Sequence, residues 1–265
     1  MEGIHQVNSH EQFQRDVASN IESLRADVDL QALSRIWIRE ITPHQWAYNF
    51  SWLGRPAIQF PNDAWAMQEI IWQVRPDLII ETGIAHGGSL IFSASMLALL
   101  DLVDAASANS TIDPKISKRK VLGIDIDIRP HNRVAIEQHP LSSRIQMIQG
   151  SSISAEVIDR VNEIAKGYSR ILVCLDSNHT HDHVLEELKA YAPLTSVGSY
   201  CVVFDTIIDD MPESFFPNRQ WSVGNNPKTA VREYLKTHTE FKIDQNVHHK
   251  LLITVAPDGY LKRIQ

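Results

Sequence analysis

The stretch Asp77-Leu-Ile-Ile-Glu-Thr-Gly-Ile-Ala-His-Gly-Gly-Ser89 joins a short apolar run that ends in a carboxylate to a glycine-rich turn. Gly83, Gly87 and Gly88 allow the backbone to turn tightly and to approach a ligand closely. Residues 89–100 are apolar enough to form a helix that packs on a sheet. The pattern predicts a strand, turn and helix that bind a nucleotide cofactor. Glu81 then lies at the strand end, where open α/β sheets bind their ligands.

The motifs that this turn does not match narrow the choice of cofactor. A dinucleotide fingerprint needs G-x-G-x-x-G, whereas the order here is Gly-Ile-Ala-His-Gly-Gly. A P-loop ends in Gly-Lys-Ser/Thr, but Gly88-Ser89 contains no lysine, and Glu81 would repel a phosphate. S-adenosylmethionine carries a sulfonium and an α-ammonium group and no phosphate, so it suits an acidic strand end. We expect a methyl-donor site, with a dinucleotide site and a purely structural unit as the alternatives.

A second carboxylate ends the next apolar run, Lys120-Val-Leu-Gly-Ile-Asp125. In doubly wound folds the acid at this point binds the ribose hydroxyls, and we assign that role to Asp125. It usually follows the glycine turn by about 20 residues. The gap is longer here because the polar stretch 104–119 is predicted to form a surface loop. Asp127 is a rival candidate, and a solvated acid in a turn is the remaining alternative.

Composition restricts the class of protein. The chain has 265 residues, of which 43% are apolar and 22% charged, as in ordinary globular proteins. A formal net charge of −7 with no Lys/Arg run argues against nucleic acid or an anionic membrane as the main partner. Cys174 and Cys201 fall inside apolar runs, which indicates buried thiols rather than a disulfide and a reducing compartment. With no signal peptide and no apolar run of about 18 residues, we expect a cytoplasmic protein without a membrane span.

The chain is predicted to have a helical N-terminal extension, residues 1–55, and a cofactor-binding domain, residues 56–265. Apolar residues recur at helical spacing over 10–40. An aromatic-rich segment, 43–65, follows. We expect its rings to form either a subunit contact or part of the core, and a substrate wall is the less favoured alternative. Since the extension and its aromatics are too apolar for one chain to cover, we expect a homo-oligomer.

From Asp63 onward strands and helices alternate, which predicts a Rossmann-like α/β fold with a mostly parallel sheet and helices on both faces. Strands are expected at 77–81, 120–125, 145–149, 170–176, 199–205, 240–247 and 250–256. A helix over 227–237 precedes the last two, which are predicted to form a hairpin separated by His248 and His249, with one antiparallel strand at the sheet edge.

Two further strands end in aspartates, Asp176 and Asp205, at the same sheet edge as Glu81 and Asp125. Two carboxylates there could hold a hard cation such as Mg²⁺, which prefers oxygen ligands and could acidify a substrate hydroxyl. The alternative is structural: Asp176 caps the helix near Thr180, and Asp205 only turns the chain.

The stretch His179-Thr-His-Asp-His183 does not fit a zinc site, because alternating histidines diverge at the start of a helix. His179 follows Asp176 closely at the mouth of the site, and histidine is the side chain that most often acts as a general base. His181 and His183 are expected to be solvated.

The chain resembles the cephalosporin hydroxylase family, whose members are class I S-adenosylmethionine-dependent methyltransferases. The matching blocks cover about residues 55–265 and are Glu81-Thr-Gly-Ile-Ala-His-Gly-Gly-Ser-Leu90, Gly123-Ile-Asp125, Leu175-Asp-Ser-Asn-His179, Phe204-Asp-Thr206, Asn226-Pro-Lys-Thr-Ala-Val231 and Lys250-Leu-Leu-Ile-Thr-Val-Ala-Pro-Asp-Gly-Tyr-Leu261. The resemblance implies a seven-stranded methyltransferase sheet similar to that of metal-dependent catechol-type O-methyltransferases.

The resemblance also implies roles for single residues. Those expected to bind the cofactor are Glu81, Gly83, Ala85 and Ser89 at the methionine end, Asp125 at the ribose, Gly150, Ser151 and Ser152 at the adenine, and Asp176. Asp176 and Asp205 are the implied metal pair, and His179 with Asp176 the implied catalytic residues. The pattern departs from the family at Phe204, since metal-dependent relatives often place two oxygen-bearing residues at that strand end and Phe204 cannot bind a cation.

The expected reaction is methyl transfer from the sulfonium to a substrate hydroxyl by in-line displacement. Family members act in antibiotic and cell-surface glycan or glycolipid pathways, so a sugar or glycolipid hydroxyl is the first choice of acceptor and a secondary metabolite the second. The segment 206–226 is expected to be the lid that selects it. A non-catalytic cofactor-binding or assembly subunit is the main alternative. A hydroxylase is the other, although no 2-His-1-carboxylate cluster can be placed in the sequence.

Overall fold

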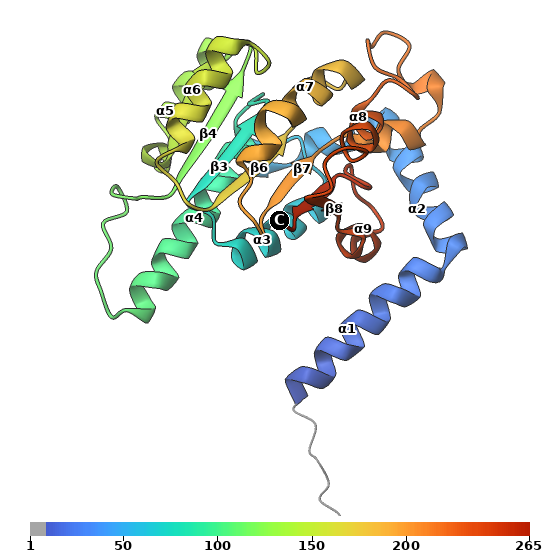
Figure 1. Cartoon of the computed structure of the whole chain (residues 1–265), viewed down its shortest axis with the longest axis horizontal. Coiled ribbons are helices and arrows are strands. Elements are labelled where there is room, and N and C mark those ends of the chain that lie inside the picture. The colour runs from blue at the N-terminus through green and yellow to red at the C-terminus, as the bar shows by residue number, and fades with distance from the viewer. Residues whose placement is uncertain (1–8) are drawn as a thin grey trace, which may run out of the picture.

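The computed structural model describes residues 9–265, and its centre is a seven-stranded sheet with the order β5-β4-β3-β6-β7-β9-β8 (Figure 1). The strands are β3 (Leu78–Thr82), β4 (Lys120–Asp125), β5 (Ile145–Gln149), β6 (Ile171–Leu175), β7 (Tyr200–Val203), β8 (Phe241–Ile243) and β9 (Tyr260–Arg263). The strands β3 to β7 pair in parallel, whereas β9 runs antiparallel to β7 and to β8. The predicted seven-stranded α/β fold is confirmed.

Helices cover both faces of this sheet. On one face pack α6 (Ala155–Ala165), α7 (His181–Tyr191) and α8 (Pro227–Tyr234). On the other pack α3 (Pro61–Val74), α4 (Gly88–Ser107), α5 (Pro130–Glu137) and α9 (Gln245–Leu251). Every residue of β3 and β6 is buried, as expected for strands covered on both sides.

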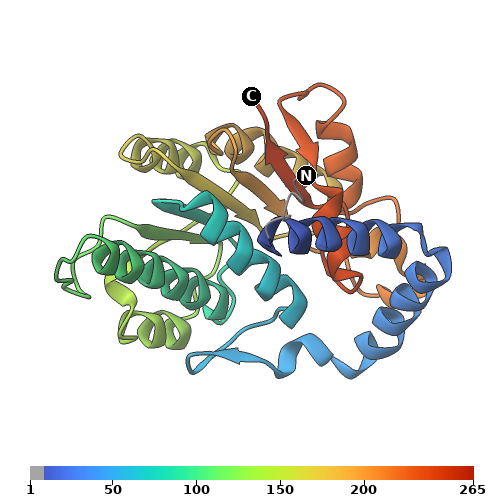
Figure 2. The same ribbon diagram turned by 90° about the horizontal axis from the view of Figure 1, so that it is seen from below.

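Within the described part of the predicted N-terminal extension, residues 9–55, the chain forms two helices, α1 (Ser9–Ala26) and α2 (Val28–Ile41). Asp27 separates them because its side chain accepts a hydrogen bond from Leu30 N at 2.9 Å and so caps α2. No residue of α1 is buried, and its contacts are with α2 and α9. Figure 1 shows α1 extending away from the sheet, and Figure 2 shows it crossing below the C-terminal elements.

The aromatic-rich segment links this extension to the sheet. It contains two short 3-10 helices, Thr42–His44 and Trp46–Asn49, and a small hairpin of β1 (Ser51–Trp52) and β2 (Arg55–Pro56). Several of its rings are core: Trp46 and Phe60 pack together with Ile38 and Met211.

The predicted C-terminal hairpin is wrong. Residues 245–251 form α9, which Asp244 caps by accepting a hydrogen bond from Asn246 N, and the last strand is β9 at 260–263. The apolar run after α9 does not join the sheet because the buried carboxylate of Asp63 binds Val255 N at 2.9 Å and the Thr254 hydroxyl. The antiparallel strand is therefore the one next to the edge, and β8 forms the edge.

Helix α4 extends further than expected, to Ser107, so the predicted loop over 104–119 begins only after its last turn. Among the described residues α4 is the single helix that is long and apolar enough to cross a membrane. In this fold it is a core helix, since Leu90, Ile91 and Leu97 are fully buried. Cys174 and Cys201 are buried and unpaired, as predicted.

Candidate active site

The carboxyl ends of the parallel strands bring the predicted residues to one edge of the sheet. Glu81 lies in β3, Asp125 ends β4, and Asp176 and Asp205 follow β6 and β7. In the sheet register Glu81 lies opposite Gly123 of β4 and Cys174 of β6, so the acids at the ends of these strands are near neighbours. This is the edge at which open α/β sheets bind ligands.

The glycine-rich turn requires glycine for two physical reasons. Gly83 has a φ of +88°, and a Cβ there would lie 2.0 Å from the carbonyl oxygen of Asp176. A Cβ on Gly88 would lie 2.2 Å from the carbonyl oxygen of Pro56. The turn is therefore squeezed between the loop after β6 and the β1–β2 hairpin, and a side chain at either glycine would push one of them away.

Glu81 is a buried carboxyl group, with 4% of its surface exposed. Its hydrogen-bond partner is the Ser89 hydroxyl, which donates from the first turn of α4. Burial raises the pKa of Glu81 to about 7, and the hydrogen bond from Ser89 opposes this shift only in part. A cation that binds beside Glu81 would favour its ionised form.

Asp125 holds the glycine-rich turn in place. Its Oδ2 accepts hydrogen bonds from the backbone of Ile84 at 2.8 Å and of Ala85 at 3.2 Å, and Asp127 N donates to its Oδ1. Ala85 has a φ of +46°, a conformation rare for a residue with a side chain. Asp127, the rival candidate, is exposed.

The loop that starts at Gly150 lies beside Asp125, since Gly150 N donates to the Asp125 carbonyl at 2.9 Å. Ser152 is buried, and its carbonyl accepts the Tyr191 hydroxyl. Ser151 accepts a hydrogen bond from Ser154 N through its carbonyl. The predicted adenine-side residues are therefore adjacent to the predicted ribose ligand.

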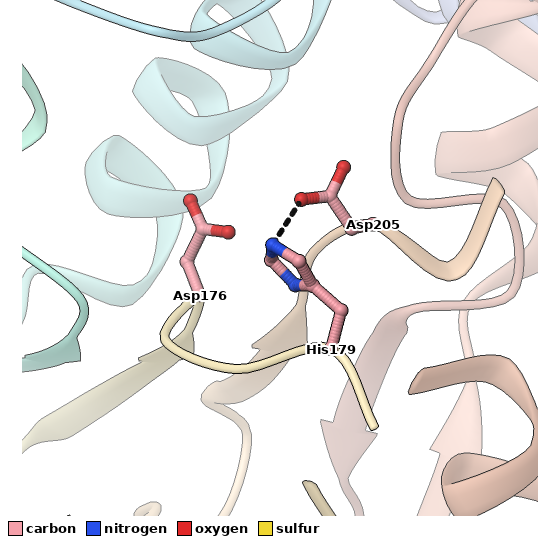
Figure 3. A group of neighbouring side chains, drawn as sticks. All are labelled: Asp176, His179 and Asp205. Atoms are coloured by element: carbon pink, nitrogen blue, oxygen red, sulfur yellow. Dashed lines mark ion pairs between the residues drawn. The ribbon is translucent and has the colours of Figure 1, made fainter. Parts of the chain in front are cut away.

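Asp176, His179 and Asp205 converge, as Figure 3 shows. One ligand atom from each residue lies within 4.8 Å of the others, and Nε2 of His179 is 3.3 Å from Oδ2 of Asp205. Burial raises the pKa of Asp176 well above its usual value, and the neighbouring Asp205 and Glu81 carboxylates raise it further.

The structural alternative for Asp176 is wrong. Helix α7 begins after Thr180, and the side chain that binds Thr180 N is that of Asn178, not Asp176. Asp205 does turn the chain, with a φ of +55°, and its carboxylate still points at His179. Phe204 beside it is buried and lines a cavity rather than the cation cluster.

Sequence reasoning gave the aromatic-rich segment too small a part in the site. A cavity that opens to solvent, with about 500 Å³ of empty space when the open solvent in its mouth is included, is lined by Trp52, Ala57, Gln59, Ala64, Met67, Glu81, Ser89, Phe92, Ser93, Cys174, Asp176 and Phe204. A second hollow beside it is bounded by Gln59, the glycine-rich turn and Asp176. Trp52 is fixed by a hydrogen bond to Ser95 Oγ at 2.9 Å and by its ring contact with Phe92. No local pattern reveals this role, because the contacts join residues far apart in the chain.

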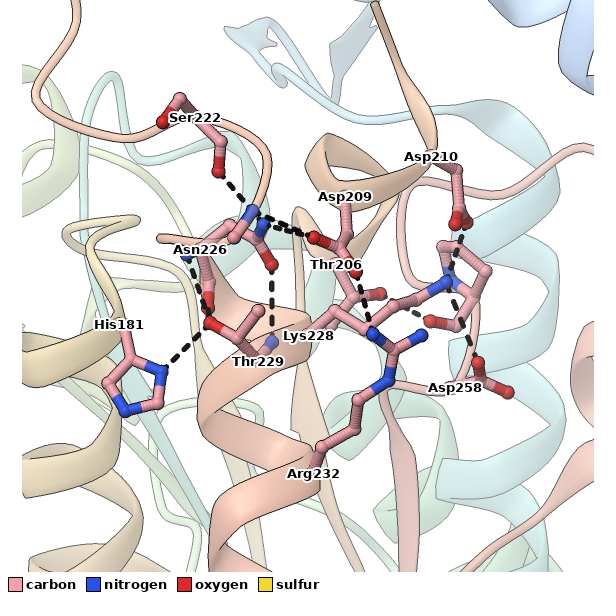
Figure 4. A network of polar contacts seen from close by, with 12 residues as sticks. His181, Thr206, Asp209, Asp210, Ser222, Asn226, Lys228, Thr229, Arg232 and Asp258 are labelled. Carbon is pink, nitrogen blue, oxygen red and sulfur yellow. Dashed lines mark hydrogen bonds and ion pairs between the residues drawn. The ribbon is translucent and has the colours of Figure 1, made fainter. Parts of the chain in front are cut away.

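The 206–226 segment reaches the cation cluster through one aromatic ring. The Trp221 ring meets the His179 ring edge-on at 4.7 Å, and the Arg219 guanidinium lies over Trp221. Asp209 joins the two ends of the segment, since its Oδ1 accepts hydrogen bonds from Gly224 N and from Asn226 Nδ2 (Figure 4).

A buried lysine stabilises the same two ends of the segment. Lys228 binds Asp210 at 2.6 Å and approaches Asp258 at 3.5 Å (Figure 4). The pKa of Asp258 is lowered to about 2, first by its contact with His248, whose Nδ1 lies 3.7 Å from Oδ1, and then by the charge of Lys228. The segment is thus held at its two ends by polar contacts, and the Trp221 side chain within it lies beside His179.

The expectation that His181 and His183 are solvated is wrong. Nδ1 of His181 lies 2.8 Å from Thr229 Oγ1 (Figure 4), and Nε2 of His183 lies 3.1 Å from Ser152 Oγ. Both side chains are about one-fifth exposed. The first turn of α7 presents them to neighbouring segments, which the sequence spacing alone does not show.

Comparisons with known proteins agree with this geometry. A model of the family described as Rhamnosyl O-methyltransferase/CmcI matches residues 44–264. Among curated proteins, rhamnosyl O-methyltransferase of Mycobacterium bovis (strain BCG / Pasteur 1173P2) is 25% identical over 232 residues, 83% of each chain. The enzyme of the same name from Mycobacterium leprae (strain TN) is 27% identical over 228 residues, 83% of this chain and 88% of its own.

Solved structures share the fold. A CmcI structure with Mg and SAM has a TM-score of 0.54 at 18% identity, covering 82% of this chain and 78% of its own. An apo structure of CmcI has a TM-score of 0.53 at 17% identity, covering 82% of this chain and 77% of its own.

Proposed function

Because the chain belongs to the rhamnosyl O-methyltransferase/CmcI family and is therefore a methyltransferase, we propose that it transfers the methyl group of S-adenosylmethionine to a hydroxyl group of a sugar. The observation that carries the proposal is the convergence of Glu81, Asp125, Asp176, His179 and Asp205 beside a cavity at one sheet edge. The mycobacterial relatives that act on rhamnosyl groups support a sugar acceptor.

The donor supplies a methyl group on a positively charged sulfur. Glu81 suits its α-ammonium group, because a cation beside a buried carboxyl group with a pKa of about 7 draws it into the ionised form. Asp125 suits the ribose. A carboxylate has about four acceptor positions, and the backbone of Ile84, Ala85 and Asp127 uses three of those on Asp125, which leaves one for a hydroxyl group.

The donor set at Asp176, His179 and Asp205 fits a divalent cation. Two carboxylates brought together without one repel each other, which is consistent with the raised pKa of Asp176. A bound Mg²⁺ would be held by Asp176 and Asp205 and would supply positive charge for a substrate hydroxyl. Since Phe204 provides no ligand, Asp176 and Asp205 are the two carboxylates that the described residues bring to this cluster.

His179 is the proposed general base. Its Nε2 lies 3.3 Å from Asp205 Oδ2, so the imidazolium that forms when the ring takes the proton of the acceptor hydroxyl would be stabilised in an ion pair with that carboxylate. The acceptor oxygen would then be held in line with the methyl group, and alignment would supply much of the rate. A secondary metabolite bearing a hydroxyl group is the second choice of acceptor.

The proposal is tested in two steps. At about 100 times its dissociation constant, S-adenosylhomocysteine should stabilise the protein by roughly 2.7 kcal/mol, while NADH should not. Incubation with S-adenosylmethionine and methyl rhamnoside should then yield a methylated sugar detectable by mass spectrometry. Stabilisation by NADH alone would contradict the cofactor, and binding without turnover across a panel of sugars would favour the non-catalytic subunit.

The cation is tested separately. We expect excess chelator to abolish turnover and Mg²⁺ to restore it. Asp176→Asn should remove both the response to Mg²⁺ and the activity. Full turnover in excess chelator would contradict the metal role and leave His179 as the only base.

A further inference from the structure

His183 occupies a polar junction below the proposed cofactor site. Its Nε2 lies 3.1 Å from Ser152 Oγ, 3.2 Å from Ser177 Oγ and 3.5 Å from Oε1 of Glu187. Ser152 belongs to the loop after β5 and Ser177 to the loop after β6, which are separated in the sheet by β4 and β3. One imidazole therefore joins two loops that the sheet itself keeps apart.

Glu187 supports this imidazole from one turn further along α7. Its side chain is fully buried, and its Oε1 accepts a hydrogen bond from Ser177 Oγ at 2.6 Å. Within residues 9–265 its Oε2 has no hydrogen-bond partner. A buried carboxyl group with an unused oxygen is costly. The position is therefore hard to explain as simple packing.

The hydrogen bonds of the junction fix the direction of its protons. Ser177 has one hydroxyl hydrogen and donates it to Glu187, so the hydrogen between Ser177 and His183 must come from Nε2 of the imidazole. The same N–H faces Ser152 Oγ. Ser152 then acts as an acceptor toward His183, and its own hydroxyl hydrogen is free to be donated elsewhere.

Both loops lead directly to proposed cofactor ligands. Ser152 follows Gly150, whose backbone N–H donates to the Asp125 carbonyl. Ser177 follows Asp176, whose carbonyl oxygen lies against Gly83. A shift of His183 would thus move the cofactor-binding loops on both sides of the sheet centre.

We propose that His183, held by Glu187, is a positioning residue that fixes these two loops and leaves the Ser152 hydroxyl hydrogen for a hydrogen bond to the adenine. Adenine ring nitrogens are acceptors, so such a donor suits them. The inference rests on the proposed function, because it needs S-adenosylmethionine to bind with its adenine toward Ser152.

The test is calorimetric titration of the full chain with S-adenosylhomocysteine and with adenosine. His183→Ala and the isosteric Glu187→Gln should each weaken both ligands about tenfold, the loss of one good hydrogen bond. His183→Gln keeps a side-chain N–H and should recover part of the affinity. Ser152→Ala should weaken binding similarly, and combining it with His183→Ala should add little. In turnover, KM for the donor should rise while kcat at saturation changes little.

His181→Ala is the matched control, because His181 is equally exposed and lies two residues away but contacts Thr229 and Glu233 instead. It should bind S-adenosylhomocysteine like the wild type. Equal losses in the two histidine variants, or no loss in Glu187→Gln while it remains folded, would overturn the inference and leave the proposed function intact. A wild type that binds neither ligand would overturn both.

Discussion

Glu81 is a carboxyl group whose ionisation the fold itself opposes. Its pKa is about 7 in the folded chain and about 4.5 when unfolded, so the folded state holds the proton more tightly between these values. Stability from this group is complete below pH 4.5 and is lost as the pH rises through 7. We expect Glu81→Gln to be more stable than the wild type at pH 8 by up to about 3 kcal/mol.

The measurement is denaturant unfolding between pH 5 and pH 8.5, and the difference between the two proteins should shrink toward pH 5. The exposed Glu163→Gln is a control that should show no such trend. The same Glu81 variant should lose its stabilisation by S-adenosylhomocysteine. A constant difference at all pH values would show that the buried charge is not its cause.

His179 should be needed for the chemical step and not for donor binding. His179→Ala is expected to lower kcat by about 10²- to 10⁴-fold, the usual contribution of a general base. The dissociation constant of S-adenosylhomocysteine should stay unchanged, because the partners of His179 are Asp205 and Trp221. His44→Ala, an exposed histidine far along the chain, should keep full activity. An equal fall in donor affinity and rate would argue for a structural role instead.

At this scale the sequence was informative where a strand ends in an acid. The sequence alone predicts that Asp176 and Asp205 lie close together, because parallel strands end at one sheet edge. The functional roles of these residues stay predictions. His183 was expected to be solvated because no local pattern shows that the loop after β5, with Ser152, reaches α7 and its Glu187.

The 206–226 segment should select the acceptor through the Trp221 side chain. Trp221 adjoins His179, and a Trp ring offers a large apolar surface for the C–H side of a sugar. Trp221→Ala should raise KM for the acceptor about tenfold, or 1.4 kcal/mol, with donor affinity unchanged. Trp221→Phe should lose less, and Pro217→Ala at an exposed position of the same segment should change nothing. Unaltered acceptor kinetics in Trp221→Ala would remove the segment from substrate selection.

Elements were predicted well where one pattern acted alone and poorly where a distant side chain intervened. The burial of β3 follows from its own residues, whereas the run 250–256 is apolar enough for a strand and is not one. Asp63, nearly two hundred residues earlier, takes the backbone N–H of Val255, and the chain pairs only later, in β9. No residue near Val255 indicates that its backbone N–H binds the Asp63 side chain rather than a neighbouring strand.

The whole molecule leaves an apolar surface on its first two helices. The exposed apolar side chains there are Phe13, Val28, Leu33, Ile36 and Trp37. We expect these to be covered by a second copy of the chain, so that light scattering gives a mass well above 30.0 kDa at micromolar concentration.

Phe13→Asp combined with Leu33→Asp should reduce the mass to that of one chain. Ile116→Asp is the control, since Ile116 is equally apolar and is 75% exposed on the loop after α4. A single-chain mass for the wild type, or the same loss of mass in the control, would contradict the expectation.

At this scale the fold class, the family and the methyltransferase class are confirmed. The closeness of the β1–β2 hairpin to the glycine-rich turn was not foreseeable. It depends on Arg55, which binds the His86 carbonyl and the Asn132 side chain, 31 and 77 positions away.

That hairpin has a kinetic consequence. Arg55 ties it across the glycine-rich turn, and Pro56 and Gln59 bound the hollow beside that turn. A donor seated there would be trapped until the tie opens, so donor and acceptor should bind in a fixed order, the donor first and S-adenosylhomocysteine leaving last. Arg55→Ala should shorten the residence time of S-adenosylhomocysteine in stopped-flow displacement, because the hydrogen bonds from Arg55 to the His86 carbonyl hold the hairpin beside that hollow.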